Sequence, residues 1–351
     1  METKEILSKL STTVGLSGNE HEVASFISDL FKGLVDEVRC DNLGNLIMLK
    51  KGSDSDNSPK VMFAAHMDQI GLMVTGIDEP GFLRVSPVGG VDQRILPSME
   101  VTVHGKRELY GVISSVPPHL SDPKDRDKAW KMKDLFVDCG MSFEELKDLV
   151  EVGDLISFNV EFFELAGSRV AGKAMDNRAG VTTLYECAKE LAKINHKCDV
   201  YLVATVQEEI NYGGAFTSTY GIMPDIGVAV DVTHADGPDL PKDQVMQMDG
   251  GPAIGVGPHV HPLVHRALVN VARESFIPYQ EEPSASPQGT DAYAIQMTGP
   301  GVATGLVSIP LRYMHTTVET LSTDDIVKSG KLLAHFAHYV DSQFKEELTC
   351  L

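Results

Sequence analysis

The sequence predicts an α/β fold in which a mixed central sheet is sandwiched by helices and a small all-β domain is inserted. The apolar runs 61–65 and 201–206 are typical of strands buried on both faces, as in sheets covered by helices. Between 72 and 166 the pattern changes to short alternating stretches separated by glycine and proline, which indicates all-β structure. We therefore expect one domain formed by 1–71 and 167–351, with 72–166 as an insertion.

Composition narrows the class of protein. A chain of 351 residues with 42% hydrophobic residues can bury a large core in one or two domains. Its 30 basic and 50 acidic residues give a formal net charge of -20, which disfavours nucleic acid and anionic membranes as partners. Five cysteines without paired metal spacing favour a reducing compartment. We expect neither a signal peptide nor a membrane-spanning segment, and hence a cytoplasmic protein.

Outside the insertion we expect helices at 19–35 and 323–344, a hairpin-like strand pair at 38–41 and 45–49, and a central strand at 61–65. The first candidate metal ligand follows this central strand. The central strand ends in His66-Met67-Asp68. Neutral imidazole is a good ligand for zinc or cobalt, and a carboxylate two residues further can hydrogen-bond the other ring nitrogen. His66 is therefore a candidate metal ligand supported by Asp68.

The insertion adds no candidate ligand. Its strands are expected at 82–85, 100–103, 109–114 and 154–160. Ser142 and Glu145 have the spacing of a capping box, which predicts a helix over 142–150. The segment 117–133 is long enough to be a functional or a disordered loop.

Glu208 and Glu209 lie at the carboxyl end of the apolar run 201–206, one residue beyond it. In open α/β sheets, ligands bind beyond the carboxyl ends of the strands. Two adjacent carboxylates there would repel each other and lose solvation, so a cation is expected opposite them, with a divalent metal ion as the leading candidate. The alternative is a strand end that enters solvent, which an isolated Glu-Glu pair would favour.

Other stretches of the same form favour the metal site. Asp176 precedes a helical pattern, where an N-cap role is the alternative. Asp231 follows the apolar strand 226–230, and His315 lies just beyond the strand 303–309. With His66, these residues place potential ligands at the ends of several neighbouring elements.

Six side chains are thus expected at one edge of the sheet, namely His66, Asp176, Glu208, Glu209, Asp231 and His315. Two divalent ions about 3.5 Å apart, each with one histidine and one terminal carboxylate and with a shared bridging carboxylate, would use five of them. The remaining glutamate is a candidate general base. Such ligand sets accept zinc, cobalt and manganese.

Nine short motifs make the sequence recognisable. They are Gly-Leu-Ser-Gly-Asn-Glu at 15–20, Asp-Asn-Leu-Gly-Asn at 41–45, Ala-His-Met-Asp at 65–68, Val-Gly-Gly at 88–90, Pro-Pro-His-Leu at 117–120, Asp-Leu-Phe-Val-Asp at 134–138, Ala-Met-Asp-Asn-Arg at 174–178, Gln-Glu-Glu at 207–209 and Arg-Tyr-Met-His at 312–315. In these motifs and their order, the chain resembles the tetrahedral, dodecameric two-metal aminopeptidases, a family also labelled glutamyl or deblocking aminopeptidases. The resemblance runs nearly end to end.

The resemblance implies a role for each candidate residue. His66 and Asp231 are expected to bind one metal ion, Glu209 and His315 to bind the second, and Asp176 to bridge the two. Glu208 is expected to act as the general base, and Asp68 to support His66. Gln69 and Asn177 stand where acids are frequent in the family, but neither position is a metal ligand in its pattern.

The resemblance also implies an activity and an assembly. The expected cofactors are two divalent metal ions per subunit, zinc or cobalt in the first place and manganese otherwise. The expected reaction removes N-terminal residues from short peptides with a free N-terminus, through a metal-activated water and the Glu208 base. The insertion 72–166 is expected to mediate dimer contacts within a homo-oligomer of twelve subunits.

Three other classes of protein fit the sequence less well than an aminopeptidase. Related two-metal carboxypeptidases and deacylases usually carry their extra domain after the glutamate pair, whereas here the β-rich insertion lies between His66 and Asp176. An endoglucanase, a label given to some members of the family, needs two carboxylates flanking a sugar cleft, and this chain has one spare glutamate and a single tryptophan, Trp130. A non-enzymatic scaffold would leave five metal ligands unexplained.

Overall fold

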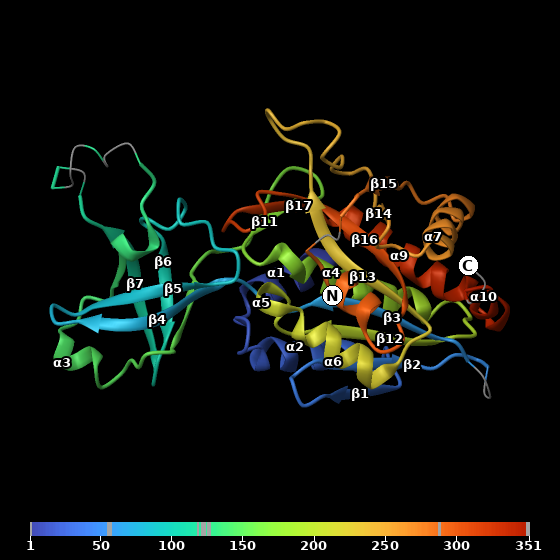
Figure 1. The fold of residues 1–351 in the computed structure, drawn as a ribbon, viewed down its shortest axis with the longest axis horizontal. Helices are drawn as coiled ribbons and strands as arrows, with labels where there is room; N and C mark the ends of the chain where they lie inside the picture. The colour runs from blue at the N-terminus through green and yellow to red at the C-terminus, as the bar shows by residue number, and fades with distance from the viewer. Residues whose placement is uncertain are drawn as a thin grey trace.

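The computed structural model of the protein describes residues 2–54, 58–117, 119–120, 124, 128–286 and 289–348. These residues form an 11-stranded mixed sheet covered by helices and a closed antiparallel barrel that lies to one side of it (Figure 1). The predicted fold class, a helix-covered mixed sheet with a small all-β insertion, is confirmed.

The large sheet has its parallel strands in the middle. Its strands are β1 (Glu37–Cys40), β2 (Leu46–Lys50), β3 (Lys60–His66), β10 (Phe163–Glu164), β11 (Arg169–Gly172), β12 (Asp199–Thr205), β13 (Ile226–His234), β14 (Ala253–Val256), β15 (Gln280–Pro283), β16 (Ala303–Arg312) and β17 (Glu319–Ser322). The order is β1-β2-β12-β3-β13-β16-β17-β11-β10, and β14 pairs with both β15 and β16. Because β12, β3, β13 and β16 run parallel, their carboxyl ends meet at one edge.

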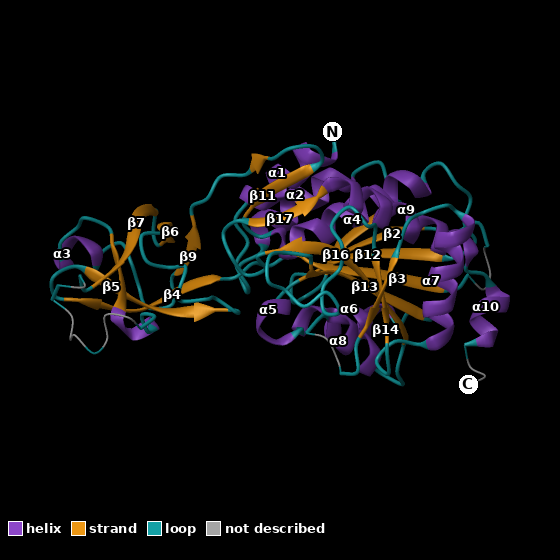
Figure 2. Ribbon diagram, turned by 90° about the horizontal axis from the view of Figure 1, so that it is seen from above, coloured by secondary structure: helices purple, strands orange, loops and turns teal. Residues whose placement is uncertain are grey.

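Helices cover both faces of this sheet (Figure 2). In the large domain they are α1 (Thr3–Thr12), α2 (His21–Phe31), α4 (Met175–Leu191), α5 (Glu208–Asn211), α6 (Gly213–Ile222), α7 (Pro262–Glu274), α8 (Asp291–Met297), α9 (Thr323–Tyr339) and α10 (Ser342–Glu347). Side chains of a strand alternate between faces, so Phe63 of β3 packs in the cluster that contains α4 and α9, whereas Met62 packs with α6 and α8. Burial on both faces explains the continuous apolar run of β3.

The barrel has its own apolar core. Its strands are β4 (Gly71–Asp78), β5 (Phe82–Val88), β6 (Glu100–His104), β7 (Glu108–Ser115), β8 (Leu135–Asp138) and β9 (Leu155–Phe158), closed in the order β4-β5-β8-β7-β6-β9. In β7, Leu109 and Ile113 point into the core, whereas Tyr110 and Val112 are 70% and 45% exposed. The helix α3 (Phe143–Leu146) has the predicted capping box between Ser142 and Glu145.

Several elements differ from the sequence prediction, and the helix predicted over 142–150 is limited to α3. The helix α1 and the strand β4 were not expected, and the pairing of β4 shifts register between Val74 and Gly76, which breaks its alternation. The last helix was predicted to run to 344, but α9 ends at Tyr339. There Val340 is extended, and Asp341 caps the separate helix α10 by accepting a hydrogen bond from the backbone N–H of Phe344.

The expected loop at 117–133 lies partly outside the described residues, and its described part contains the short 3-10 helix η1 (Met132–Asp134). Among the helices of the described ranges, none has the length and apolar character needed to cross a membrane.

Candidate active site

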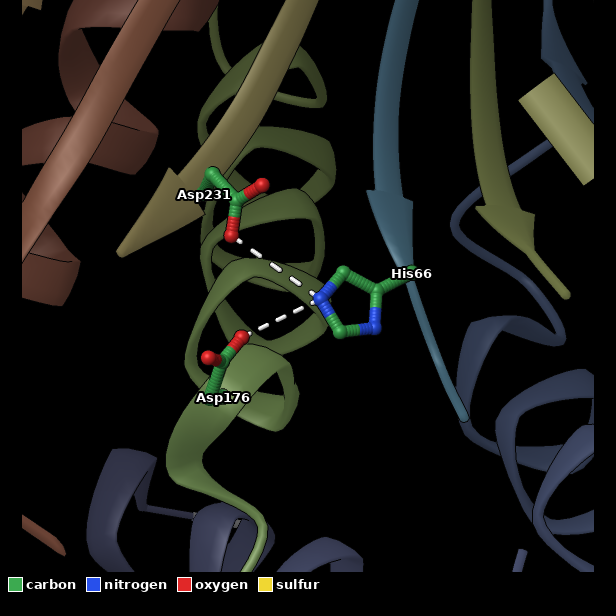
Figure 3. Close-up of side chains that lie close together, drawn as sticks. All are labelled: His66, Asp176 and Asp231. Atoms are coloured by element: carbon green, nitrogen blue, oxygen red, sulfur yellow. Dashed lines mark hydrogen bonds and ion pairs between the residues drawn. The ribbon is translucent and has the colours of Figure 1, made fainter. Parts of the chain in front are cut away.

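The carboxyl edge of the parallel strands gathers the predicted site residues from separate elements. His66 is the last residue of β3, and Asp231 lies within β13, which continues to His234. The pairing of β3 with β13 ends at Ala64 and Ala229, two residues before His66 and Asp231. The two strands therefore separate where these side chains meet (Figure 3).

The two glutamates do not lie on a strand end as expected. The strand β12 ends at Thr205, Gln207 takes a left-handed conformation with φ 58°, and Glu208 and Glu209 begin the short helix α5. The turn brings both side chains back over the edge of the sheet. Glu208 is buried, and its Oε2 lies 3.8 Å from Nε2 of His66.

The first group of potential metal ligands centres on His66. Its Nε2 lies 3.1 Å from Oδ1 of Asp176 and 3.9 Å from Oδ1 of Asp231 (Figure 3). Ligand atoms of these three residues all lie within 4.8 Å of one another. One imidazole and two carboxylates thus face a common point, as expected for a divalent cation.

The second group centres on His315, just beyond β16. Its Nε2 lies 3.4 Å from Oδ2 of Asp176 and 3.5 Å from Oε2 of Glu209. The other ring nitrogen, Nδ1, donates a hydrogen bond of 3.0 Å to the carbonyl oxygen of Gly90. Since a carbonyl can only accept, Nδ1 carries a proton, and Nε2 is the ring nitrogen that faces the two carboxylates and is available to a metal ion.

Asp176 belongs to both groups. It lies at the start of α4 with non-helical φ and ψ of -78° and 102°, and the peptide bond that joins it to Asn177 is cis. Its Oδ1 faces His66, and its Oδ2 faces His315. A carboxylate in this position can bridge two cations.

Asp68 supports the site from behind. Its Oδ1 lies 3.4 Å from Nδ1 of His66, and it accepts hydrogen bonds from the Ser17 hydroxyl at 2.6 Å and from the backbone N–H groups of Glu208 and Glu209 at 3.0 and 3.2 Å. Burial would raise the pKa of Asp68, but His66 and Ser17 lower it below its ordinary value. The same carboxylate therefore orients an imidazole and fixes the turn that carries both glutamates.

The site concentrates carboxyl groups away from water. Burial raises the pKa of Glu208 to about 10 and the pKa of Asp231 well above its ordinary value, and neighbouring carboxylates add to both increases. Burial also raises the pKa of Glu209 to about 7. Burial would also raise the pKa of Asp176, but the contacts with His315 and His66 lower it. The ion pairs of these carboxylates within the described ranges are all with the two histidines.

This donor set fits two divalent cations. Four buried carboxylates outweigh the positive charge that two imidazoles can supply, so additional cations would relieve their repulsion. Oxygen and imidazole nitrogen are suitable ligands for zinc, cobalt and manganese. In front of the site lies a cavity of about 300 Å³ whose wall includes Glu208, Tyr212 and Gly90.

Sequence reasoning missed two buried acids at this edge. Glu319, the first residue of β17, accepts hydrogen bonds from the backbone N–H of Asp176 at 3.2 Å and of His315 at 2.8 Å, and so holds both groups in place. Asp291, at the start of α8, accepts a hydrogen bond of 2.5 Å from the hydroxyl of Thr205.

Asn177, one of the two departures from the family pattern, has a structural task. Its Nδ2 donates to the carbonyl oxygen of Val230 at 2.8 Å, and its Oδ1 accepts from the backbone N–H of Gly180 at 2.9 Å. An ionised aspartate could not donate the first of these bonds. The side chain ties the start of α4 to β13, next to Asp231.

The family model for the M42 glutamyl aminopeptidases matches residues 44–332. The chain belongs to this family. The M42 chain is 39% identical over 333 residues to a lysyl aminopeptidase from Pyrococcus furiosus, covering 93% of this chain and 94% of the relative. The family makes it a hydrolase of peptide bonds of the aminopeptidase class.

Solved structures of similar proteins agree. The M42 chain superposes on a TET aminopeptidase from the archaeon Thaumarchaeota archaeon SCGC AB-539-E09 with a TM-score of 0.93 at 30% identity, over 99% of this chain and 98% of the other. It superposes on the Pyrococcus horikoshii TET1 peptidase, described as able to assemble into a tetrahedron or a large octahedral shell, with a TM-score of 0.85 at 32% identity, over 97% and 100% of the two chains. The resemblance drawn from the nine motifs is thereby confirmed.

Proposed function

We propose that this M42 chain is a two-metal aminopeptidase that removes N-terminal residues from short peptides, with Glu208 as the general base. The observation that carries the proposal is the position of Asp176, whose two carboxylate oxygens face two separate groups of potential ligands. Glu208 belongs to neither group, although it lines the same cavity.

Five residues would hold the metal ions. The inner ion would be bound by His66, Asp231 and Asp176, and the outer ion by Glu209, His315 and Asp176. When bound, the two cations would act as Lewis acids on the scissile carbonyl and lower the pKa of water in the cavity. Zinc or cobalt is the proposed metal, with manganese as the other candidate.

Glu208 moves the proton in this mechanism. Its carboxylate lies beside the two ligand groups at the cavity wall, where it can take the proton of the attacking water. The same carboxyl group then donates this proton to the leaving amine. Asp68 holds the N–H groups of Glu208 and Glu209, so it positions the base relative to the ligands.

The free α-amino group of the substrate sets the exopeptidase reaction. The carboxylates at the cavity wall attract an ammonium group, whereas an acetylated N-terminus carries no charge to place there. We therefore propose that peptides with a free N-terminus are shortened one residue at a time. Folded proteins, whose termini do not reach the cavity, are not expected as substrates.

A homo-oligomer is the proposed state of assembly. The barrel, within the insertion 72–166, exposes the apolar side chains Tyr110 and Val112 on the outer face of β7. Large exposed apolar surfaces are typical of interfaces. A solved TET1 structure described as a dodecamer, 32% identical to this chain, supports a dodecamer built from dimers, with the barrel as the dimerisation domain. We propose a cytoplasmic location for this assembly.

One experiment separates the candidate functions. The purified protein, loaded with zinc or cobalt, is incubated with an aminoacyl chromogenic amide, a peptide in free and N-acetylated form, and a soluble cellulose derivative. We expect hydrolysis of the amide and the free peptide, loss of activity with a chelator, and at least about a tenfold lower rate for the acetylated peptide. Cleavage from the C-terminus, equal rates for both peptides, or hydrolysis of the cellulose derivative alone would contradict the proposal.

A further inference from the structure

Residues 206–209 form the base turn, which follows β12 and begins α5. Its first two backbone N–H groups donate to side chains from the N-terminal part of the chain. The N–H of Val206 donates to Oδ1 of Asn45 at 3.0 Å, and the N–H of Gln207 donates to Oε1 of Glu20 at 3.2 Å. Both acceptors are buried, since Asn45 is 0% and Glu20 is 6% exposed. The base turn is therefore bound to the protein interior at its first two residues.

Asp68 accepts the other two N–H groups of the base turn, those of Glu208 and Glu209. Four consecutive N–H groups thus donate to three side chains that lie at least 140 residues earlier in the chain. The first N–H groups of a helix have no acceptor within the helix, so acceptors from elsewhere determine where the helix begins and where its first side chains point. In this protein the first of those side chains is the candidate base.

The backbone of the base turn needs this support. Gln207 has φ 58° and ψ 29°, a left-handed conformation that is unfavourable for a residue with a Cβ atom. Gln207 is also the N-cap of α5, but its own side chain, which lies within the described residues, makes no capping hydrogen bond. The carboxylate of Glu20 supplies the acceptor for its N–H group instead.

Each of the two acceptors is itself held in place. Oε1 of Glu20 also accepts the backbone N–H of Gly18 at 2.8 Å. Nδ2 of Asn45 donates to Oδ2 of Asp41 at 2.7 Å and to the hydroxyl of Thr217 at 2.9 Å. Because the amide nitrogen of Asn45 is used in this way, its Oδ1 is the atom that faces the base turn.

Glu20 and Asn45 lie away from the space that a substrate would occupy. Neither is among the described residues that line the cavity in front of the metal ligands, and Glu20 lines a separate cavity of about 440 Å³ together with Val206. Glu20 ends the motif 15–20 and Asn45 ends the motif 41–45, and neither motif contributes to the two ligand groups. Any effect of these residues on the reaction therefore acts through the base turn.

We propose that Glu20 and Asn45 are positioning residues, which fix the base turn and thereby the place of the Glu208 carboxylate at the cavity wall. The inference rests on the aminopeptidase function proposed above. Displacement of a reacting group by about 1 Å can lower a rate about a hundredfold. Because the base acts in the catalytic step and not in substrate binding, loss of either acceptor lowers kcat and leaves KM nearly unchanged.

Glu20 allows a graded test with an aminoacyl p-nitroanilide and the metal-loaded full chain. Glu20→Ala removes the acceptor and should lower kcat by about tenfold or more, with KM changed by less than about twofold. Glu20→Gln keeps an oxygen acceptor and should retain most of the wild-type kcat. Glu22→Ala, a change at an exposed carboxylate two residues further, is the matched control and should leave kcat unchanged. Wild-type kcat in Glu20→Ala, or equal losses in the Ala and Gln variants, would overturn the proposal.

A double-mutant cycle separates positioning of the base from a general structural role. In Glu208→Gln protein the base is absent, so the addition of Glu20→Ala should lower kcat no further. A loss by the same factor in both backgrounds would show that Glu20 supports the fold and not the base. Both metal ions should stay bound in Glu20→Ala, because Asp68 still accepts the N–H of Glu209. Loss of an ion from this variant would assign Glu20 to the support of a metal ligand and contradict the proposal.

Further variants cover the second acceptor and a failure to fold. Asn45→Ala should also lower kcat without changing KM, and an unchanged kcat in folded protein would remove Asn45 from the proposal. If circular dichroism shows that Glu20→Ala does not fold, Glu20→Asp replaces it. This variant keeps the charge but shortens the side chain by one methylene group, so kcat should still fall, and a wild-type kcat would overturn the role of Glu20.

The wild-type protein shows which of the two proposals has failed. If it hydrolyses the amide and Glu20→Ala is equally active, the positioning role is wrong and the aminopeptidase function stands. If metal-loaded wild-type protein hydrolyses no aminoacyl amide, the proposed function and the positioning role are both wrong.

Discussion

The two ligand groups that share Asp176 differ in burial and in what holds their histidine. The side chain of His66 is 2% exposed and that of His315 is 35% exposed. Nδ1 of His66 faces the buried carboxylate of Asp68, whereas Nδ1 of His315 donates to the backbone carbonyl of Gly90, just beyond the barrel strand β5. A carboxylate behind a histidine raises its basicity as a ligand more than a neutral carbonyl does.

The inner group is built on two parallel strands, and the outer group on a helix start and a loop. We infer that the inner ion is held more tightly and exchanges more slowly with solvent. The outer group lies at the more exposed side, where His315 contacts Gly90 just beyond the barrel strand β5. The following predictions test this difference, beginning with the largest expected effect.

Replacement of Asp176, the ligand shared by the two groups, should remove both metal sites. Asp176→Ala takes one ligand from each group, so both ions should be lost and turnover should fall on the order of a thousandfold or more. Elemental analysis of the purified variant after dialysis, with circular dichroism as the folding control, measures this. Retention of two ions per subunit would show that Asp176 does not bridge.

Glu208→Gln should stop catalysis without affecting either group. The amide cannot take the proton of the attacking water, so turnover should fall by roughly a hundredfold or more while both ions stay bound. Glu209→Gln, a change at the adjacent residue, is the matched control and should weaken the outer ion. A Glu208→Gln protein that has lost an ion would identify Glu208 as a ligand and not the base.

The two histidine variants should separate the two ions. His66→Ala and His315→Ala each remove one nitrogen ligand, so each should lower the metal content toward one ion per subunit. In the wild-type protein, a chelator should release the ions in two phases, and the faster phase should be absent in His315→Ala. If the faster phase is instead absent in His66→Ala, the inner group is the weaker of the two.

The smallest effects on metal binding are expected from the two residues that contact the Nδ1 atoms of the histidines, Asp68 and Gly90. Asp68→Asn should weaken the inner ion by about 10 to 100-fold, because the buried group loses its charge toward His66, and the outer ion by less, because Asp68 reaches that group only through the N–H of Glu209. Gly90→Ala should weaken the outer ion, because a Cβ there would lie 2.6 Å from Nδ1 of His315. Gly221→Ala is the control, since a Cβ there has no neighbour within 4 Å. Equal losses at both ions in either variant would show that the two groups are not independently supported.

The local sequence pattern predicted the strands that carry the site, because a buried strand followed by a metal ligand appears in the sequence as an apolar run that ends in His or Asp. The run before His66 and the run before Asp231 both predicted strands, and a parallel sheet brings their ends together. Glu319 could not be found in this way. Its carboxylate accepts hydrogen bonds from the backbone N–H of Asp176, which is far away in the sequence, and from that of His315, which lies in a loop. Nothing in the local sequence around Glu319 distinguishes it from a surface glutamate.

Element ends were harder to predict than element types, because single hydrogen bonds decide them. The predicted final helix continues its periodicity past Tyr339, yet the side chain of Asp341 starts a new helix there. The glutamate pair was expected at the carboxyl end of a strand, but it lies beyond that end in a helical turn, where Asp68 accepts the N–H groups of both residues. Both outcomes depend on contacts that periodicity does not report.

The most direct test of the account is a crystal structure of the metal-loaded protein with anomalous scattering from the bound ions. The account predicts two peaks about 3.5 Å apart, one among His66, Asp231 and Asp176 and the other among His315, Glu209 and Asp176. The carboxylate of Glu208 should lie beside both peaks and bind neither. A single peak, or a peak bound by Glu208 in place of Glu209 or Asp231, would contradict it.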